Sequence, residues 1–279
     1  MSLSYEQRVL RVLQHIHDNP AGDLSLDALS EVACMSRFHW HRVFHAMTGE
    51  TCAQAVRRIR LSLAASWLNN YDFSVKEVAI RAGYPNLHSF TRAFSERYGI
   101  PPAAFRKEGL ASPLQTQSLR GEFTMFKVET STVPERQLGA IMHRGAYTEI
   151  GSCFERLAKL ATEQNLWPSV KGMIGVHYDD PNVVKVTNLR SHAGLWFTKD
   201  TAIPVPLENI VLPAGNSAIL HYKGPYTALK VAYDFLYGDW LPKSGLEPAD
   251  AAPYELYLNS PLDTQESELL TDIVLPLAS

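Results

Sequence analysis

The chain has 279 residues, of which 46% are hydrophobic and 20% are charged, and its formal net charge is −3. This composition is that of a globular protein and excludes an intrinsically disordered chain. The length exceeds a typical domain of about 100–200 residues, so we expect two domains. No run approaches the roughly 18 consecutive apolar residues that cross a bilayer. The three scattered cysteines are too few for a disulfide framework or a thiolate metal site. We therefore expect a cytoplasmic protein with no membrane partner, no metal and no cofactor.

The charge is distributed unevenly along the chain. Residues 1–110 contain 13 Lys or Arg against 10 Asp or Glu, which gives +3, whereas residues 111–279 contain 13 against 19, which gives −6. The N-terminal part is therefore the better candidate for contact with a polyanion.

Helical periodicity dominates the chain from Tyr5 to Arg106. Apolar side chains recur at i, i+3, i+4 and i+7, first in Val9–Ile16 and later in a longer helix at about 53–69. Ser25 is expected to cap a helix, and Ser74 with Glu77 forms a capping-box pattern. The other helices expected here span 26–33, 37–47, 75–82, 87–97 and a short last one begun by two prolines.

This helical part contains an internal repeat. Arg42-Val43-Phe44 recurs as Arg92-Ala93-Phe94 at an offset of 50, and each copy reads helix, short turn, helix. The second helix of each copy leaves an outer face that can enter the major groove of DNA, where arginine pairs with guanine. The residues predicted on these two faces are Arg37, Phe38, His39, His41 and Arg42, then Leu87, His88, Thr91 and Arg92. Two such helices joined by one long helix could reach neighbouring groove faces about 34 Å apart from a monomer.

Two other polar groups in this part have competing interpretations. His39 and His41 are two residues apart and point away from each other on a helix, so a metal pair is not expected. Arg57, Arg58 and Arg60 on the connecting helix either contact phosphates or lie on a solvated face.

The segments LSLDALSEVACMSRFHWHRVFHAMTG and AIRAGYPNLHSFTRAFSERYGIPPAAFR resemble the double helix-turn-helix domain of AraC/XylS transcription regulators, over about residues 5–107. The resemblance implies that the second helix of each motif enters the major groove, and that duplex DNA and RNA polymerase are partners. One turn position of this family is usually glycine. Gly83 occupies it in the second motif, but Cys34 occupies it in the first. Because a non-glycine residue is disfavoured at positive φ, we expect a slightly altered first turn.

The segment 110–121 is rich in Gly, Ser, Pro and Gln, which predicts a linker between domains at 1–109 and 122–279. Beyond it, β-branched and aromatic runs alternate with Gly and Pro, which predicts an α+β domain with helices near 149–164 and 227–238. The expected strands are 123–130, 138–143, 173–178, 195–198, 209–212, 218–222, 254–258 and 272–275. Gly145-Ala146-Tyr147 recurs as Gly224-Pro225-Tyr226, so the domain is expected to hold tandem strand–helix–strand–strand units.

The segments HRGAYTEIGSCFERL, MIGVHYDDP, HYKGPYTALKVAYDFL and APYELYLNSP resemble the GyrI-like small-molecule-binding domain of Rob-type multidrug-sensing regulators, over about residues 121–279. The resemblance implies a cleft between the two copies and a strand glutamate that attracts cationic, lipophilic ligands; Glu255 matches that glutamate. A carboxylate without a basic partner favours a cation, and aromatic faces add about 0.5–2 kcal/mol. Strand alternation places Tyr257 on the same face as Glu255. The expected walls of the cleft are Tyr147, Tyr226 and Trp196.

Together these features predict a sequence-specific DNA-binding transcription regulator, not an enzyme, that responds to a small lipophilic or cationic effector. Two alternatives stay open. One is a hydrolase that detoxifies reactive small molecules and carries an autoregulatory DNA-binding domain, because Glu255 beside a tyrosine can act as acid or base if burial raises its pKa. The other is a protein-interaction module that docks a macromolecule in the cleft.

Overall fold

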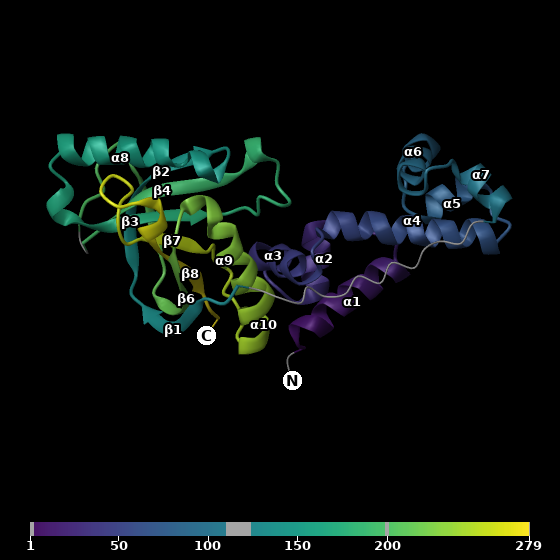
Figure 1. The fold of residues 1–279 in the computed structure, drawn as a ribbon, viewed down its shortest axis with the longest axis horizontal. Coiled ribbons are helices and arrows are strands. Elements are labelled where there is room, and N and C mark those ends of the chain that lie inside the picture. The colour runs from purple at the N-terminus through teal and green to yellow at the C-terminus, as the bar shows by residue number, and fades with distance from the viewer. Residues whose placement is uncertain (1–2, 110–123, 199–200, 279) are drawn as a thin grey trace. The chain divides into compact units, whose positions relative to one another are not determined.

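The computed structural model describes residues 3–109, 124–198 and 201–278. The chain divides into two units, Met1–Gly121 and Glu122–Ser279, each with its own fold (Figure 1). The segment 110–121, predicted as a linker, lies outside the described residues. None of the described helices combines the length and the hydrophobicity of a membrane span.

Within residues 3–109 the first unit is all helical, as predicted from its periodicity. Its helices are α1 (Tyr5–Asp18), α2 (Leu26–Ala33), α3 (Arg37–Thr48), α4 (Cys52–Asn70), α5 (Val75–Arg81), α6 (Leu87–Tyr98) and α7 (Pro102–Glu108). The long helix α4 joins two groups, α1–α3 at one end and α5–α7 at the other (Figure 1). Both predicted caps are confirmed: Ser25 accepts the N–H of Ala28, and Ser74 with Glu77 forms a capping box.

Aromatic packing fixes the second helix of each repeat against its own group. In α6 the buried Phe94 ring lies 5.5 Å from Phe90 and 5.2 Å from Phe105, measured between ring centroids. In α3 the buried Trp40 and Phe44 rings lie 5.3 Å apart. These rings occupy the inner helical faces, which leaves other faces of α3 and α6 for contacts outside the core.

The first two hydrogen bonds of the turn are the same in both helix-turn-helix repeats, but α3 begins three residues after Cys34 and α6 begins four residues after Gly83, so the first turn is one residue shorter. Cys34 N–H donates to Glu31 and Met35 N–H donates to Ser30 at 3.1 Å. At an offset of 49, Gly83 N–H donates to Ile80 and Tyr84 N–H to Ala79 at 3.0 Å. Cys34 adopts the left-handed conformation, with φ of 52°, that Gly83 adopts with φ of 74°. Cys34 therefore adopts a backbone conformation that is energetically unfavourable for a residue with a side chain.

The second unit is an α+β fold built on one eight-stranded antiparallel sheet with the order β1-β6-β8-β7-β3-β4-β2-β5. The strands are β1 (Lys127–Val133), β2 (Arg136–Arg144), β3 (Val170–His177), β4 (Arg190–Phe197), β5 (Glu208–Leu212), β6 (Gly215–Lys223), β7 (Tyr254–Tyr257) and β8 (Leu270–Pro276). The helices are α8 (Gly151–Glu163) and α9 (Leu229–Phe235), which continues through a π turn (Leu236–Trp240) into α10 (Leu241–Ser244). All eight predicted strands are present with shifted ends.

The duplication is larger than the predicted strand–helix–strand–strand unit, because each copy begins with one more strand. The first copy is β1–β2–α8–β3–β4 and the second is β5–β6–α9–β7–β8. The extra strands are exchanged: β1 pairs with β6 of the second copy, and β5 pairs with β2 of the first. The copies meet in the middle of the sheet, where β3 pairs with β7.

The two repeated Gly-x-Tyr turns occupy equivalent places. Gly145 and Gly224 have φ of 131° and 143°, and each is followed by a short 3-10 helix that begins at Tyr147 or Tyr226. Helix α8 then packs on β2 and β4, and α9 packs on β6. The helix-facing side of the central strands β3 and β7 therefore lies between the two helices of the duplication.

Candidate functional sites

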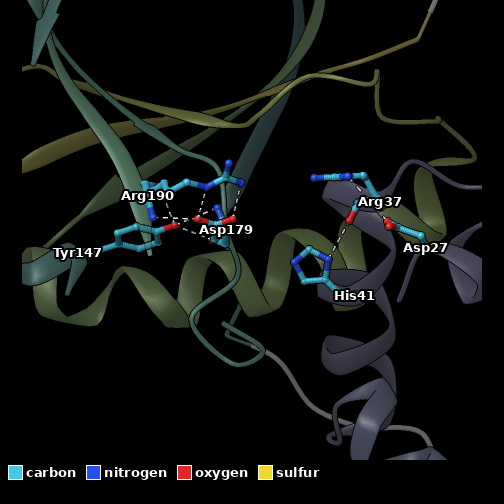
Figure 2. Close-up of polar contacts among 6 residues, drawn as sticks. All are labelled: Asp27, Arg37, His41, Tyr147, Asp179 and Arg190. Carbon is cyan, nitrogen blue, oxygen red and sulfur yellow. Dashed lines mark hydrogen bonds and ion pairs between the residues drawn. The ribbon is translucent and has the colours of Figure 1, made fainter. Parts of the chain in front are cut away.

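On the first candidate DNA-reading helix, α3, Arg37 and Phe38 lie at the N-terminal end. The Arg37 side chain is 59% exposed, and one terminal nitrogen lies 3.9 Å from an Asp27 oxygen (Figure 2). Its guanidinium carbon is 5.7 Å from the centroid of the half-buried Phe38 ring. Arg42 is half-buried on the same helix. These three residues retain some accessible surface, as the prediction requires.

His39 and His41 are buried, so their prediction as exposed groups on the outer face is wrong. His39 lies four residues before the buried Val43, which puts it on the inner stripe of the helix. The His41 ring nitrogen Nδ1 lies 2.9 Å from the backbone oxygen of Arg37, so the ring is held along its own helix (Figure 2). The solvent-accessible face of α3 is therefore narrower than predicted, because it does not include His39 or His41.

On the second candidate reading helix, α6, Leu87, His88 and Arg92 are exposed and Thr91 is half-buried. The Arg92 side chain is 77% exposed, and its Nε donates to the Glu96 carboxylate at 3.0 Å. Glu96 also pairs with Arg57 of α4. Hydrogen bonds from Arg57 and then from Arg92 hold the pKa of the Glu96 carboxyl below its ordinary value. Glu96 thus orients Arg92 without covering it.

The three arginines of α4 all have partners within the unit, while Arg57 is exposed and Arg58 and Arg60 are half-buried, so contact with phosphates stays a prediction. Arg57 pairs with Glu96, and Arg58 forms a two-point pair with the buried Glu50, with its shorter contact at 2.6 Å. The Nε of Arg60 donates to the backbone oxygen of Pro20 at 2.7 Å. Each of these guanidinium groups ties α4 to another part of the unit.

In the second unit, Glu255 of β7 is the centre of a buried polar cluster. Its carboxylate accepts hydrogen bonds from the hydroxyls of Tyr257, at 2.8 Å, and of Tyr233 on α9, at 3.1 Å. The His177 Nε2 atom of β3 lies 3.3 Å from the same carboxylate. The expectation of a carboxylate without a basic partner is therefore wrong. His177 and Tyr233 were missed because they come from other elements of the fold.

A glycine makes room for this cluster. Gly175 is the direct neighbour of Glu255 in the β3–β7 pair. A Cβ atom at Gly175 would lie 2.6 Å from the Tyr257 hydroxyl and 3.0 Å from His177 Nε2. Both groups can therefore approach the carboxylate only because this position has no side chain.

Three of the four predicted ligand residues are brought together. The Tyr226 ring lies 5.2 Å from Tyr257 and the Tyr147 ring 4.6 Å from His177, both measured between centroids, so each borders the Glu255 cluster. Phe154 of α8 adds a third aromatic ring, 5.3 Å from Tyr257. Tyr147 is also firmly anchored, because its hydroxyl donates to the backbone oxygen of Asp179 at 2.8 Å (Figure 2).

Trp196 does not belong to this cluster, so its prediction as a wall of the same cleft is wrong. It packs with Tyr254 and Leu256 on the opposite face of the sheet from Glu255. There the Arg136 guanidinium lies 4.8 Å from the Trp196 ring centroid. A single tryptophan in a strand gave no indication of which face it would occupy.

The cluster favours an ionised Glu255. Burial alone would raise the pKa of this carboxyl, but the adjacent His177 ring and the hydrogen bonds from Tyr257 and Tyr233 outweigh it, so the pKa lies below its ordinary value of 4.5. Burial and the adjacent Glu255 charge raise the pKa of the Tyr257 hydroxyl well above 10.0. At neutral pH the site therefore contains a buried carboxylate and a protonated phenol.

These features define a protein with a duplicated helix-turn-helix unit and a duplicated α+β unit that carries a charged aromatic site. The GyrI-like small molecule binding domain family matches residues 126–278, and a helix-turn-helix domain family matches residues 29–108. The chain belongs to the GyrI-like family and has an AraC-type helix-turn-helix domain.

Known relatives and solved structures each match part of this chain. The transcription factor PqrA of Proteus vulgaris is 31% identical over 86 residues, which are 31% of this chain and 70% of PqrA. The regulator MtrA of Neisseria gonorrhoeae is 32% identical over 104 residues, which are 37% of this chain but only 35% of MtrA. The solved C-terminal domain of EcmrR is 18% identical, with a TM-score of 0.44, and the match covers 56% of this chain and 99% of that domain.

The pKa of Glu255 leads to an expected dependence of stability on pH. Because the folded-state pKa is lowered, the ionised carboxylate stabilises the fold above about pH 4.5, and this contribution is lost as the pH falls through the folded-state value. We expect Glu255→Gln to lower the urea midpoint at pH 7. The difference in urea midpoint between this variant and the unmodified protein should become smaller at lower pH. Glu155→Gln, at an exposed position of α8, serves as the control. A gap that widens on acidification would mean that the buried carboxyl is protonated.

Proposed function

We propose that this protein binds specific duplex DNA through α3 and α6 and regulates transcription in response to a lipophilic cation bound beside Glu255. The observation that carries the DNA-binding part is the repeated turn. Because the first two turn hydrogen bonds of the first motif recur 49 residues later in the second, α3 and α6 are the corresponding second helices of the two motifs. Each presents arginine at its accessible surface, Arg37 and Arg42 on α3 and Arg92 on α6. The match of residues 29–108 to a helix-turn-helix domain family supports the same assignment.

Selection of bound sequences from a random duplex pool tests this part. We expect enrichment of a motif with two halves about 10–10.5 base pairs apart, the spacing of successive major-groove faces. The same selection with a lipophilic cation present would show altered recovery of that motif. Absence of any enriched sequence would contradict the proposal. RNA polymerase is the proposed partner through which promoter occupancy changes transcription.

We infer the effector class from the charge of Glu255 and from the aromatic rings around it. A buried carboxylate among the rings of Tyr226, Tyr257 and Phe154 favours a positive charge on an aromatic or apolar body. His177 already contacts this carboxylate, so an incoming cation has to compete with it. We therefore expect selectivity for cations whose apolar body offsets the loss of the His177 contact.

Tetraphenylphosphonium is a suitable probe of this site. We expect Glu255→Gln to weaken its binding to the full chain at least about tenfold, equivalent to roughly 1.4 kcal/mol, because the variant keeps the shape but removes the charge. Isothermal titration calorimetry measures the change, with Glu155→Gln as the matched control. Equal affinities for the two variants would place the cation elsewhere.

Binding and not turnover is the proposed role of Glu255. The hydrolase alternative required burial to raise its pKa, whereas the donors around it lower that pKa. An ionised carboxylate that accepts two phenol hydrogen bonds is poorly suited to donate a proton. Incubation with a reactive electrophile checks this point, since turnover that is lost in Glu255→Gln would contradict the assignment.

A further inference from the structure

Two side chains that occupy equivalent positions in the duplication contact Glu255. His177 and Tyr257 each come two residues before the repeated turns at 179–181 and 259–261. Their strands, β3 and β7, are neighbours in the middle of the sheet, and both side chains reach the Glu255 carboxylate. One copy of the repeat therefore contributes an imidazole, which can carry a positive charge, where the other contributes a phenol.

His177 is the basic partner of Glu255. Its Nε2 atom lies 3.3 Å from a carboxylate oxygen, and the side chains of His177 and Glu255 are only 6% and 7% exposed. Within the described part of the chain, no other basic side chain pairs with Glu255. Burial raises the pKa of the Glu255 carboxyl and the His177 ring lowers it, which is the effect of a positive charge beside a carboxylate. A proton on His177 therefore balances the buried negative charge.

The other groups of the cluster keep their charge state near neutral pH. Those that can titrate are one carboxyl and three phenols: Glu255, Tyr257, Tyr147 and Tyr233. The pKa of Glu255 lies below 4.5, that of Tyr257 lies well above 10.0, and phenols ordinarily ionise near about pH 10. On β4 the strand neighbour of His177 is Ser191, which does not titrate. Histidine is the side chain that ordinarily changes charge between about pH 5 and 8.

A cation that binds beside Glu255 changes this charge balance. With the His177 proton retained, two positive charges would face one carboxylate in a buried site. Burial of an uncompensated charge is costly, and the two cations would also repel each other. If the proton leaves, the ligand takes over its role as the counter-charge, and the neutral imidazole no longer opposes binding.

We propose that binding of a cation beside Glu255 releases a proton from His177, so that the affinity of the site for cations rises with pH. This inference rests on the cation site proposed above and adds a means of regulating it. One N–H bond of the imidazolium breaks, its electron pair stays on the ring nitrogen, and the proton passes to water or to a buffer base. Because linkage is reciprocal, acidification expels the cation.

Tetraphenylphosphonium suits the test, because its own charge does not depend on pH. Calorimetric titration of the full chain at about pH 5.5, about pH 7 and about pH 8.5 measures the affinity. Repetition in buffers of different ionisation enthalpy gives the number of protons released. We expect the affinity to be at least about tenfold tighter at the highest pH than at the lowest. At least about half a proton per bound cation should be released at one or more of these pH values.

His177→Gln keeps a polar side chain that cannot hold the proton. Its affinity for tetraphenylphosphonium should vary less than about twofold over the same pH range, and at about pH 5.5 should exceed that of the unmodified protein at least about threefold. A purely structural role of His177 would instead weaken binding at every pH. His221→Gln is the matched control, because the partly exposed His221 also contacts two carboxylates, those of Asp272 and Glu129. It should retain the pH dependence.

The outcomes separate this inference from the proposed cation site. Absence of tetraphenylphosphonium binding at every pH would overturn both. Binding with a constant affinity and no released proton would overturn the proton coupling alone. A pH dependence that persists in His177→Gln would assign the proton to another group and contradict the role of His177. The measurements on the unmodified protein remain decisive even if this variant does not fold.

Discussion

Replacing Gly83 by alanine is expected to lower the free energy of unfolding of the N-terminal unit by about 3 kcal/mol. Gly83 has φ of 74°, a conformation that L side chains rarely adopt. A Cβ atom there would lie 2.4 Å from the backbone oxygen of Pro20 and 2.7 Å from the Arg60 guanidinium. Because Arg60 itself donates to that oxygen, the added methyl group would also disrupt this partly buried hydrogen bond. Urea denaturation of the full chain, with hydrogen exchange of α4–α6, measures the loss.

The equivalent position of the first repeat provides the matched control. Cys34 holds the same turn in the left-handed conformation, so Cys34→Gly is expected to raise the free energy of unfolding by about 1 kcal/mol. Opposite signs for the two substitutions would establish that both turns require positive φ. A loss of stability in Cys34→Gly would instead show that the cysteine side chain makes a contact worth more than the backbone strain.

Replacing Arg92 by alanine is expected to weaken binding to the selected DNA site by about 1–3 kcal/mol, or roughly 5–150-fold, and to relax the preference at one base pair. The Arg92 side chain is highly exposed on α6, and Glu96 holds it through Nε. Competition titrations against duplexes altered at single positions measure both changes.

Arg81→Ala is the control for this measurement, because Arg81 is also exposed but lies at the end of α5, with its guanidinium 4.1 Å from the Phe73 ring centroid. It should leave the base preference unchanged. If Arg92→Ala weakens binding equally for every sequence, Arg92 contacts a phosphate and not a base.

The helices of the first unit could be predicted from the sequence because short-range chemistry determines them. Apolar periodicity, the Ser25 cap and the Ser74–Glu77 capping box all act within a few residues, and each is found where it was expected. The burial of His39 and His41 was not predictable in the same way. Polar residue type suggested an exposed face, whereas the position of each ring depends on how α3 packs.

Only the members of the Glu255 cluster that lie on strand β7 could be predicted from the sequence. Alternation correctly placed Tyr257 beside Glu255, since that relation is local. His177 and Tyr233 reach the carboxylate from a neighbouring strand and from α9, so their roles depend on strand order and helix position. The surroundings of Arg136 could not be predicted either, because its aromatic neighbours lie on two other strands. Such long-range contacts leave no spacing signal in one sequence.

The exchange of β1 and β5 between the two copies of the C-terminal unit has a consequence for its ancestry. The first strand of each copy pairs with the second strand of the other copy. A single copy would therefore lack this edge strand and leave backbone N–H and C=O groups unpaired at the edge of its sheet. A single-copy ancestor would complete its sheet most simply by trading that strand with an identical molecule, as domain-swapped dimers do. Gene fusion would then have made the pairing permanent and allowed its two halves to diverge, leaving a carboxylate in one half and a facing imidazole in the other.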